Sequence, residues 1–277
     1  MEGVHPFIQK HLDVKSIQPL HGGDINSVYL INSSSVVKLN RSDEFPGMFD
    51  REAEGLKLLS STFHTPEVIQ VQADKEWQLL ELAYIPEHQK TSNFWNNFGH
   101  QLAETHQQST DEFGLDQDNY IGSLKQLNSK HKNWTTFLIE SRLQPMIEMA
   151  VNSGEVNYVE AKIIEHFYKR IEEIYPEEAP ALIHGDLWSG NYLSAERGPT
   201  LIDPAVYYGH REMDLGMMHL FGGFDNRLFE TYHEIYPLEH AWQSRIRYNQ
   251  LYPLLVHVNL FGRSYWSRVH TILKEFA

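Results

Sequence analysis

Cysteine is absent from this 277-residue chain, which excludes disulfide bonds, thiolate metal sites and cysteine nucleophiles. Long apolar runs are also missing, since no stretch approaches the roughly 20 apolar residues that a membrane-spanning helix needs. The first twenty residues include Glu2, Lys10, Asp13 and Lys15, so they lack the apolar core of a signal peptide. We therefore expect a soluble, cytoplasmic protein with no membrane association.

Basic residues are few in comparison with acidic ones. The chain has 23 Lys and Arg against 37 Asp and Glu, which gives a formal net charge of -14. A surface of this charge repels phosphate backbones, so we do not expect nucleic acid as a partner. Cationic or amine-bearing substrates suit such a surface, although solubility alone also explains it.

The first 85 residues have the pattern of a small antiparallel sheet with one helix. A short helix is expected over 4–14, and helical spacing of apolar residues predicts a second over 50–60. Runs rich in β-branched residues predict four strands, at 27–31, 35–39, 67–72 and 76–82. The first two strands flank a polar turn at 32–34, which is typical of a hairpin.

After Pro86 the pattern becomes mainly helical. Helices are expected over 94–108, 134–152, 156–175 and from 240 to the end, with a kink or break at Pro253. The fold class is therefore α+β and bilobal. We expect a sheet-based N-lobe over 1–85 and a helical C-lobe over 86–277. A cleft between two such lobes is a common place for a nucleotide.

Two short apolar runs each end in a carboxylate, at Asp186 and Asp203, and Asn191 lies between them. Phosphoryl transfer needs these groups: one Asp to orient the attacking hydroxyl and accept its proton, and an Asn and a second Asp to hold Mg²⁺ on the triphosphate. A polar turn that caps its own backbone is the alternative. Because His184 and Gly185 come before Asp186, we favour an ATP-dependent kinase.

Lys38 lies in the second predicted strand, where alternation directs Val37 and Leu39 to the opposite face. Glu52 and Glu54 begin the next helix, and either can pair with Lys38 to fix it on the α- and β-phosphates. A lysine in solvent on an edge strand is the alternative. The downstream carboxylates favour the phosphate clamp.

Two more segments are candidates for nucleotide binding because of their positions. The turn before the first strand has backbone amides that can cover phosphates, and its residues are Gly22, Gly23, Asp24, Ile25 and Asn26. No Gly-Lys-Ser/Thr follows it, so it is not a Walker loop. In a kinase-like fold the end of the last strand would meet the adenine edge through Glu81, Leu82 and Ala83. A plain turn and a plain strand end are the alternatives.

The longer motifs resemble those of the fructosamine kinase (ketosamine kinase) family, which belongs to a protein-kinase-like group with aminoglycoside and choline kinases. The matching segments are His-Gly-Asp-Leu-Trp-Ser-Gly-Asn at 184–191, Leu-Ile-Asp-Pro-Ala at 201–205, and a middle region with Phe113, Asn119, Gly122, Gln126, Asn128, Trp134, Phe137 and Arg142. The resemblance implies a bilobal protein-kinase-like fold. It also implies ATP-dependent phosphorylation of a sugar hydroxyl of ketoamines, which are the products of sugar addition to amines. In that family the added phosphate makes the adduct unstable, so the sugar is lost and the amine is repaired.

The resemblance also implies a role for each candidate residue. The roles are Asp186 as catalytic base, Asn191 and Asp203 as Mg²⁺ ligands, Lys38 as phosphate clamp, and Glu52 rather than Glu54 as its partner. Asp214 resembles a buried Asp that braces the catalytic loop through His184, with an Asp on a surface helix as the alternative. Trp188 can stack on the sugar or its amine side, or it can be core packing.

Two rival functions remain open at this point. One is a kinase for another amino-alcohol or aminoglycoside-like metabolite, against which the family-like stretch from 113 to 143 argues. The other is a nucleotide-binding pseudokinase. Such proteins usually lose the base or a metal ligand, whereas this chain keeps Lys38, Asp186, Asn191 and Asp203.

Overall fold

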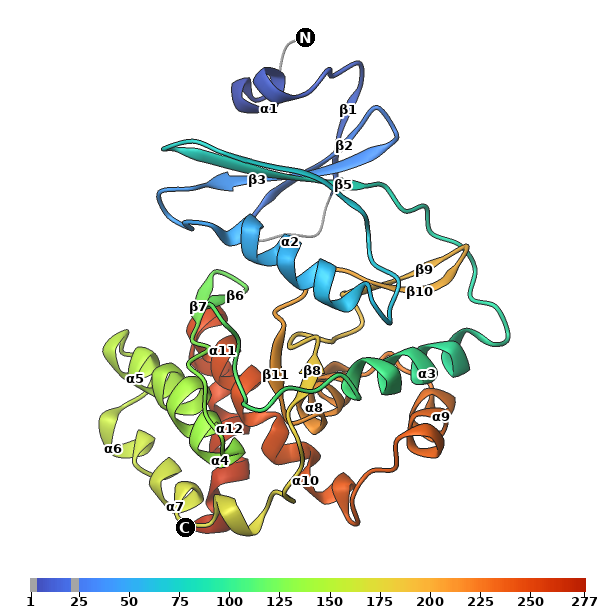
Figure 1. Cartoon of the computed structure of the whole chain (residues 1–277). Coiled ribbons are helices and arrows are strands. Elements are labelled where there is room, and N and C mark those ends of the chain that lie inside the picture. The colour runs from blue at the N-terminus through green and yellow to red at the C-terminus, as the bar shows by residue number, and fades with distance from the viewer. Residues whose placement is uncertain (1–3, 21–24) are drawn as a thin grey trace.

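A five-stranded antiparallel sheet lies above a mainly helical region in the computed structural model (Figure 1), which describes residues 4–20 and 25–277. The strands follow the order β1-β2-β3-β5-β4. Their bounds are β1 (Ile17–Leu20), β2 (Ser27–Ile31), β3 (Ser35–Arg41), β4 (Val68–Ala73) and β5 (Trp77–Ala83). The four predicted strands are confirmed, and the fold class is the predicted bilobal α+β class.

The predicted hairpin between β2 and β3 is also confirmed. Asn32 and Ser33 adopt positive φ angles of 52° and 55° in its turn. Asn tolerates this left-handed conformation better than most residues, and such turns match the twist of the two strands they join. The local sequence therefore sets the register in which Val28 faces Lys38.

The two faces of the sheet are covered by different helices. Helix α1 (Pro6–His11) packs on one face, where Val37 and Leu39 are buried. Helix α2 (Met48–Leu59) packs on the other face, against Leu80 and Leu82. Helix α2 lies between the sheet and the helical region (Figure 1). Because side chains alternate along β3 and Lys38 is paired with Leu80, Lys38 lies on the face toward α2.

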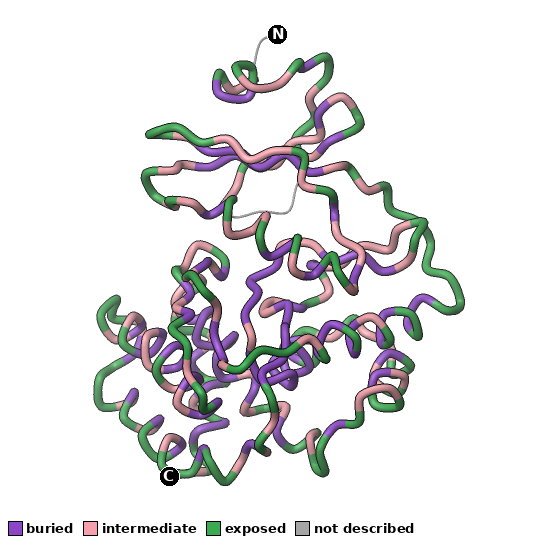
Figure 2. The backbone as a smooth tube through the Cα atoms, viewed as in Figure 1, coloured by how far each residue is buried: buried purple, intermediate pink, exposed green. Residues whose placement is uncertain are grey.

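The region below the sheet is built from helices around two apolar clusters, with buried positions concentrated where the helices face one another (Figure 2). The helices are α3 (Phe94–His106), α4 (Trp134–Phe137), α5 (Gln144–Asn152), α6 (Tyr158–Ala161), α7 (Ile164–Tyr168), α8 (Glu212–Phe221), α9 (Asn226–Ile235), α10 (Trp242–Asn249), α11 (Leu251–Phe261) and α12 (Trp266–Leu273). None of the helices described has the length and hydropathy of a membrane span.

Three small strand pairs position the loops that face the sheet. They are β6 (Asn119–Ile121) with β7 (Leu124–Gln126), β8 (Ala181–Ile183) with β11 (Tyr207–Gly209), and β9 (Tyr192–Ala195) with β10 (Gly198–Leu201). Strand β8 ends immediately before His184, and β10 ends two residues before Asp203. The predicted strand-to-carboxylate pattern is thus present at both segments.

Some sequence expectations for the fold were wrong. The helix expected over 156–175 is divided into α6, α7 and a 3₁₀ turn, Ile171–Glu173. Strand β1 was not predicted because it is short, contains Pro19 and lies at the sheet edge, where proline is tolerated. By contrast, the break expected at Pro253 is present: α10 ends at Asn249 and α11 begins at Leu251, so Pro253 lies in the first turn of α11, where its missing N–H has no intrahelical partner to lose.

A buried ion pair fixes the start of α8. The Arg245 guanidinium of α10 donates to both carboxylate oxygens of Glu212 at 2.6–3.2 Å, and Glu212 is 1% exposed. Substitution Arg245→Met leaves this carboxylate buried without its counter-charge, so we expect the free energy of unfolding to fall by about 3–5 kcal/mol. Denaturant unfolding followed by tryptophan fluorescence measures the change.

The matched control is Arg247→Met, on the same helix as Arg245, which removes an exposed ion pair with Glu275 near the C-terminus. Its expected cost is below about 1 kcal/mol, because solvent screens that pair. Equal losses in the two variants would contradict a special role for the buried pair.

Candidate active site

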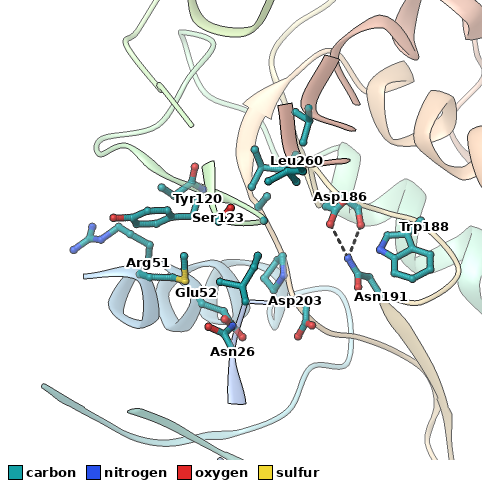
Figure 3. Close-up of a pocket in the computed structure, with 18 of the residues that line it drawn as sticks. Asn26, Arg51, Glu52, Tyr120, Ser123, Asp186, Trp188, Asn191, Asp203 and Leu260 are labelled. Atoms are coloured by element: carbon teal, nitrogen blue, oxygen red, sulfur yellow. Dashed lines mark hydrogen bonds between the residues drawn. The ribbon is translucent and has the colours of Figure 1, made fainter. Parts of the chain in front are cut away.

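A cleft of about 550 Å³ lies between the sheet with α2 and the helical region (Figure 3). Its volume is in the usual range for small-molecule sites. Both regions contribute polar side chains to its lining, namely Asn26, Lys38 and Glu52 from above and Asp186, Asn191 and Asp203 from below. Ile25 and Trp188 line it as well, so eight of the candidate site residues singled out from the sequence share one cavity.

Lys38 joins the two sides of this cleft. Its Nζ atom lies 2.6 Å from Glu52 Oε1 and 2.5 Å from Asp203 Oδ1. Burial is the largest influence on the lysine and lowers its pKa, but the attraction of Asp203 and Glu52 outweighs it and the pKa is raised. Glu54 instead pairs with Arg51 at the surface, so the geometry favours Glu52 over Glu54.

Asp186 follows β8 and faces the cleft. Asn191 Nδ2 donates to the Asp186 carboxylate at 3.0 Å and to its backbone oxygen at 2.8 Å (Figure 3). Burial raises the pKa of Asp186 to about 7, the Asn191 hydrogen bond opposes this rise, and the charges of Asp203 and Asp214 add to it. A carboxylate with such a pKa can accept a proton near neutral pH.

Asp214 of α8 holds the loop before Asp186 from behind. Its two carboxylate oxygens accept the backbone N–H groups of His184 and Gly185 at 2.8 and 2.9 Å. The brace thus acts on the backbone at His184, and the His184 side chain contacts Ile202 O instead, at 2.9 Å. Burial alone would raise the pKa of Asp214, but hydrogen bonding and charge from His106 and His184 lower it.

Sequence reasoning missed His106 of α3, which lies 3.2 Å from Asp214 Oδ2 through its Nε2 atom. No local signal marks this residue, because the two partners are 108 positions apart. Gly185 was part of the motif, and the structure shows why a glycine is needed there. Its φ is +82°, and a Cβ atom would lie 2.2 Å from Ala205 O.

Asn191 and Asp203 have the donor chemistry for a divalent cation. Asn191 uses its Nδ2 on Asp186, which leaves Oδ1 available as a ligand. Asp203 has a half-exposed carboxylate and a left-handed φ of 54°, a conformation that recurs at functional sites. Amide and carboxylate oxygens suit Mg²⁺, which usually completes its shell with phosphates and waters. The residues present therefore fit the metal of a nucleotide complex.

Aromatic side chains also line the cleft, in addition to its polar groups; we call them the aromatic end. Trp188, Phe221 and Phe261 are 40–52% exposed and line it together with His257. The Trp188 ring lies 6.2 Å from Phe221, which in turn lies 5.1 Å from His257. Exposure in the cleft favours a ligand-facing role for Trp188 over core packing.

Sequence reasoning also missed Phe221 and Phe261, although a signal was available. Each residue ends a helix and precedes a glycine with positive φ, Gly222 or Gly262. Gly at this position commonly terminates a helix. A large apolar residue followed by such a glycine therefore marks the end of a helix, where an exposed ring is free to face a cavity.

The remaining predicted nucleotide-binding residues are placed as follows. Ile25 and Asn26 line the cleft, whereas Gly22, Gly23 and Asp24 lie outside the described residues. The predicted adenine-contacting residues at the end of β5 are not among the described residues that line the cleft. They are Glu81, Leu82 and Ala83. The Ala83 N–H donates to Glu67 O at 2.9 Å, so this donor is already used within the protein.

Comparison with known proteins gives a consistent result. The sequence model of the fructosamine kinase family matches residues 4–277. A probable ketoamine kinase of Enterococcus faecium is 36% identical over 264 residues, which cover 93% of this chain and 94% of that protein. A probable ketoamine kinase of Vibrio parahaemolyticus is 38% identical over 267 residues, 92% and 90% of the two chains.

Solved structures agree with the sequence relatives. A candidate fructosamine-3-kinase from Thermobifida fusca superposes with a TM-score of 0.83 at 32% identity, covering 95% of this chain and 94% of that one. The ADP-bound aminoglycoside phosphotransferase APH(2'')-Ib has a TM-score of 0.66 at 16% identity and covers 97% and 95%. This second likeness shows the kinase-like fold alone.

The pKa of Asp186 makes the stability of the metal-free protein depend on pH. The folded-state value is about 7, and the unfolded value is about 4. Between these values the unfolded chain releases a proton that the folded chain keeps, so ionisation favours unfolding as pH rises. Asp186→Asn removes this effect, and we expect the variant to melt a few degrees above wild type at pH 8.

The difference should be much smaller near pH 4, where the carboxyl is neutral in the folded wild type and only about half ionised in the unfolded chain. Scanning fluorimetry without metal or nucleotide measures both melting temperatures. An offset of the same size at pH 4 and pH 8 would show that the carboxylate charge is not its cause.

Proposed function

The chain belongs to the fructosamine kinase family, and from this premise we propose that it transfers the γ-phosphate of ATP to a sugar hydroxyl of a ketoamine. Family and fold establish a phosphotransferase of kinase-like architecture. The observation that carries the proposal is the position of Lys38, held by Glu52 and Asp203 in the same cleft as Asp186. Phosphoryl transfer needs this combination of a clamp, a metal ligand and a base.

Asp186 is the proposed catalytic base. Its carboxylate accepts the Asn191 amide at 3.0 Å, which fixes the direction of the remaining oxygen lone pairs. It orients the attacking hydroxyl in line with the γ-phosphate and takes its proton as the new ester bond forms, while the bond from the γ-phosphorus to the bridging oxygen of the β-phosphate breaks and ADP leaves. With a pKa near 7, a large fraction of the Asp186 carboxyl is ionised at neutral pH and the carboxylate still has a high affinity for the hydroxyl proton.

Asn191 and Asp203 are the proposed Mg²⁺ ligands, and the ion supplies positive charge to the triphosphate when it is bound. Lys38 then contacts the α- and β-phosphates, and Glu52 keeps its ammonium group in place. The backbone amides of Ile25 and Asn26, which line the cleft, are the proposed cover for the phosphates. The end of β5 at 81–83 remains the proposed adenine contact, provided that the Ala83 bond to Glu67 opens.

The aromatic end of the cleft is the proposed site for the ketoamine. An indole or phenyl face attracts both sugar C–H bonds and a protonated amine. Among the described lining residues, the carboxylates are Glu52, Asp186 and Asp203, and all three are committed to phosphoryl transfer. No acidic side chain of this lining is left for further ammonium groups, which favours a substrate with one amine over a polycationic aminoglycoside.

The biological consequence follows from the chemistry of the product. A phosphate ester on the sugar makes a ketoamine unstable, so the sugar leaves and the amine is restored. We therefore propose a role in the repair of glycated amines, including those on proteins, in the cytoplasm. A pseudokinase is disfavoured because the base, the clamp and both metal ligands are present in one cleft.

The substrate class is tested with a panel of acceptors. Purified protein with ATP and Mg²⁺ is assayed for ADP release with ribulosamine, erythrulosamine and fructosamine adducts of lysine, and with kanamycin and choline as comparison acceptors. We expect turnover of at least one ketoamine and little of kanamycin or choline. Activity confined to kanamycin or choline would overturn the ketoamine assignment.

The catalytic base is tested in the same assay. Asp186→Asn keeps the size of the side chain and removes the proton acceptor, so we expect kcat to fall by about 10²–10⁴-fold. Nucleotide binding and thermal stability should be retained. A variant that turns over within a few fold of wild type would rule out Asp186 as the base.

The aromatic subsite is tested by Phe221→Ala and Phe261→Ala. Each removes part of the exposed wall, so we expect KM for the ketoamine to rise about tenfold while KM for ATP stays within twofold. The matched control is Tyr158→Ala, an exposed aromatic residue of α6 outside the cleft lining. Equal effects on the two substrates would contradict an acceptor subsite at this wall.

A further inference from the structure

The β6–β7 hairpin of the helical region lies directly below α2 (Figure 1). The Tyr120 hydroxyl donates to Pro46 O at 3.1 Å, just before α2 begins. The turn residues Gly122 and Ser123 line the cleft. This hairpin therefore contacts the element that carries Glu52 and also borders the cavity in which phosphoryl transfer is proposed.

The base of the hairpin is bonded to the chain that follows Asp203. Asn119 Nδ2 donates to Val206 O at 2.8 Å, and Gln126 Nε2 donates to Ala205 O at 3.0 Å. Both side chains are buried, at 4% and 1% exposed. Two buried amides therefore hold the carbonyl groups two and three residues after Asp203.

A buried cation stands behind these amides. Arg142 belongs to the π-helical segment Leu138–Leu143 and is fully buried, yet no carboxylate of a described residue lies within ion-pair distance of it. Its guanidinium donates instead to the carbonyl oxygens of Leu127 and Ser141 and lies against the rings of Tyr207 at 3.9 Å and Phe137 at 4.6 Å. Burial of a cation without an anion is costly, so its placement calls for a reason.

One effect of the cation is to fix the orientation of the neighbouring side-chain amides. A guanidinium only donates, so the 2.8 Å bond from Arg142 fixes the oxygen of Asn128 toward it. The Asn128 nitrogen must then donate to Asn119 Oδ1, at 2.9 Å. Asn119 is left with its nitrogen directed at Val206 O. Each amide in the chain polarises the next.

Gln126 belongs to the same network. Besides Ala205 O, its nitrogen donates to Asn119 Oδ1 at 2.8 Å, and its oxygen accepts the hydroxyl of Tyr252 at 2.9 Å. All hydrogen-bonding groups of this side-chain amide point in fixed directions as a result. The network therefore ends in two oriented donors, one on each carbonyl group of the segment 205–206.

We propose that Arg142, Asn128, Asn119 and Gln126 are positioning residues that hold the segment 203–206, and with it Asp203, in the geometry required for the nucleotide's metal. The inference rests on the proposed role of Asp203 as a metal ligand. Asp203 has a left-handed φ of 54°, a conformation that persists only when its surroundings impose it. The oriented amides supply that restraint.

The decisive pair of variants is Gln126→Leu and Tyr252→Phe. Gln126→Leu removes the donor to Ala205 O, whereas Tyr252→Phe removes the hydroxyl bond to Gln126 and leaves the contact with Ala205 intact. Gln126→Leu also removes the bond to Asn119 Oδ1 and the acceptor of the Tyr252 hydroxyl, so it should cost more stability than Tyr252→Phe. A role in fold stability alone would lower the melting temperature of Gln126→Leu without changing the affinity of the folded protein for the metal–nucleotide complex, whereas a positioning role weakens that affinity.

Titration calorimetry of Mg²⁺ with AMP-PNP measures the effect without any acceptor substrate. We expect Gln126→Leu to weaken binding about tenfold and to raise the Mg²⁺ concentration for half-maximal kinase activity by a similar factor. Tyr252→Phe should stay within twofold of wild type in both measurements. KM for the acceptor should be unchanged in Gln126→Leu.

Equal losses in the two variants, wild-type binding by Gln126→Leu, or failure of the wild-type chain to bind the metal–nucleotide complex would each overturn the proposal. If Gln126→Leu does not fold, Asn119→Ser withdraws the donor from Val206 O and carries the same expectation. A wild-type chain that binds Mg²⁺ with AMP-PNP but phosphorylates no ketoamine would contradict the proposed substrate and leave this inference standing.

Discussion

The structure of the cleft depends on one buried ammonium group shared by two carboxylates. Lys38 lies on a central strand where an unpaired charge would be costly, and it is stabilised by Glu52 from α2 and Asp203 from the loop after β10. These partners come from the two regions of the fold. The same three side chains therefore connect the sheet, its helix and the helical region, and place the proposed phosphate clamp beside a proposed metal ligand.

The two loops below the lysine are held to each other and to the helices behind them. The Ala205 N–H donates to His184 O at 2.9 Å, and Gly185 passes close enough to Ala205 O that no side chain fits. Asp214 holds the first loop through its backbone amides, and the buried amides of the β6–β7 hairpin hold the second. Two independent restraints thus meet where Asp186 and Asp203 face the cleft.

Much of this arrangement was predictable because its signals are local. The alternation around Lys38, the helical spacing of α2 and the run from His184 to Asn191 each lie within about a dozen residues of sequence, and the structure has the corresponding elements. The relation of His106 to Asp214, or of Tyr252 to Gln126, is different, because each pair is more than 100 positions apart. Only packing brings such partners together. The short helices of 156–175 were missed because apolar spacing alone does not reveal where a helix is interrupted.

The central claim is that these groups transfer a phosphate to a sugar hydroxyl of a ketoamine. Phosphorus NMR of wild-type protein with ATP, Mg²⁺ and the ribulosamine adduct of lysine tests it most directly. The account predicts a new phosphomonoester resonance that grows in step with ADP. Release of ADP with inorganic phosphate alone, or no consumption of ATP with any ketoamine, would contradict it.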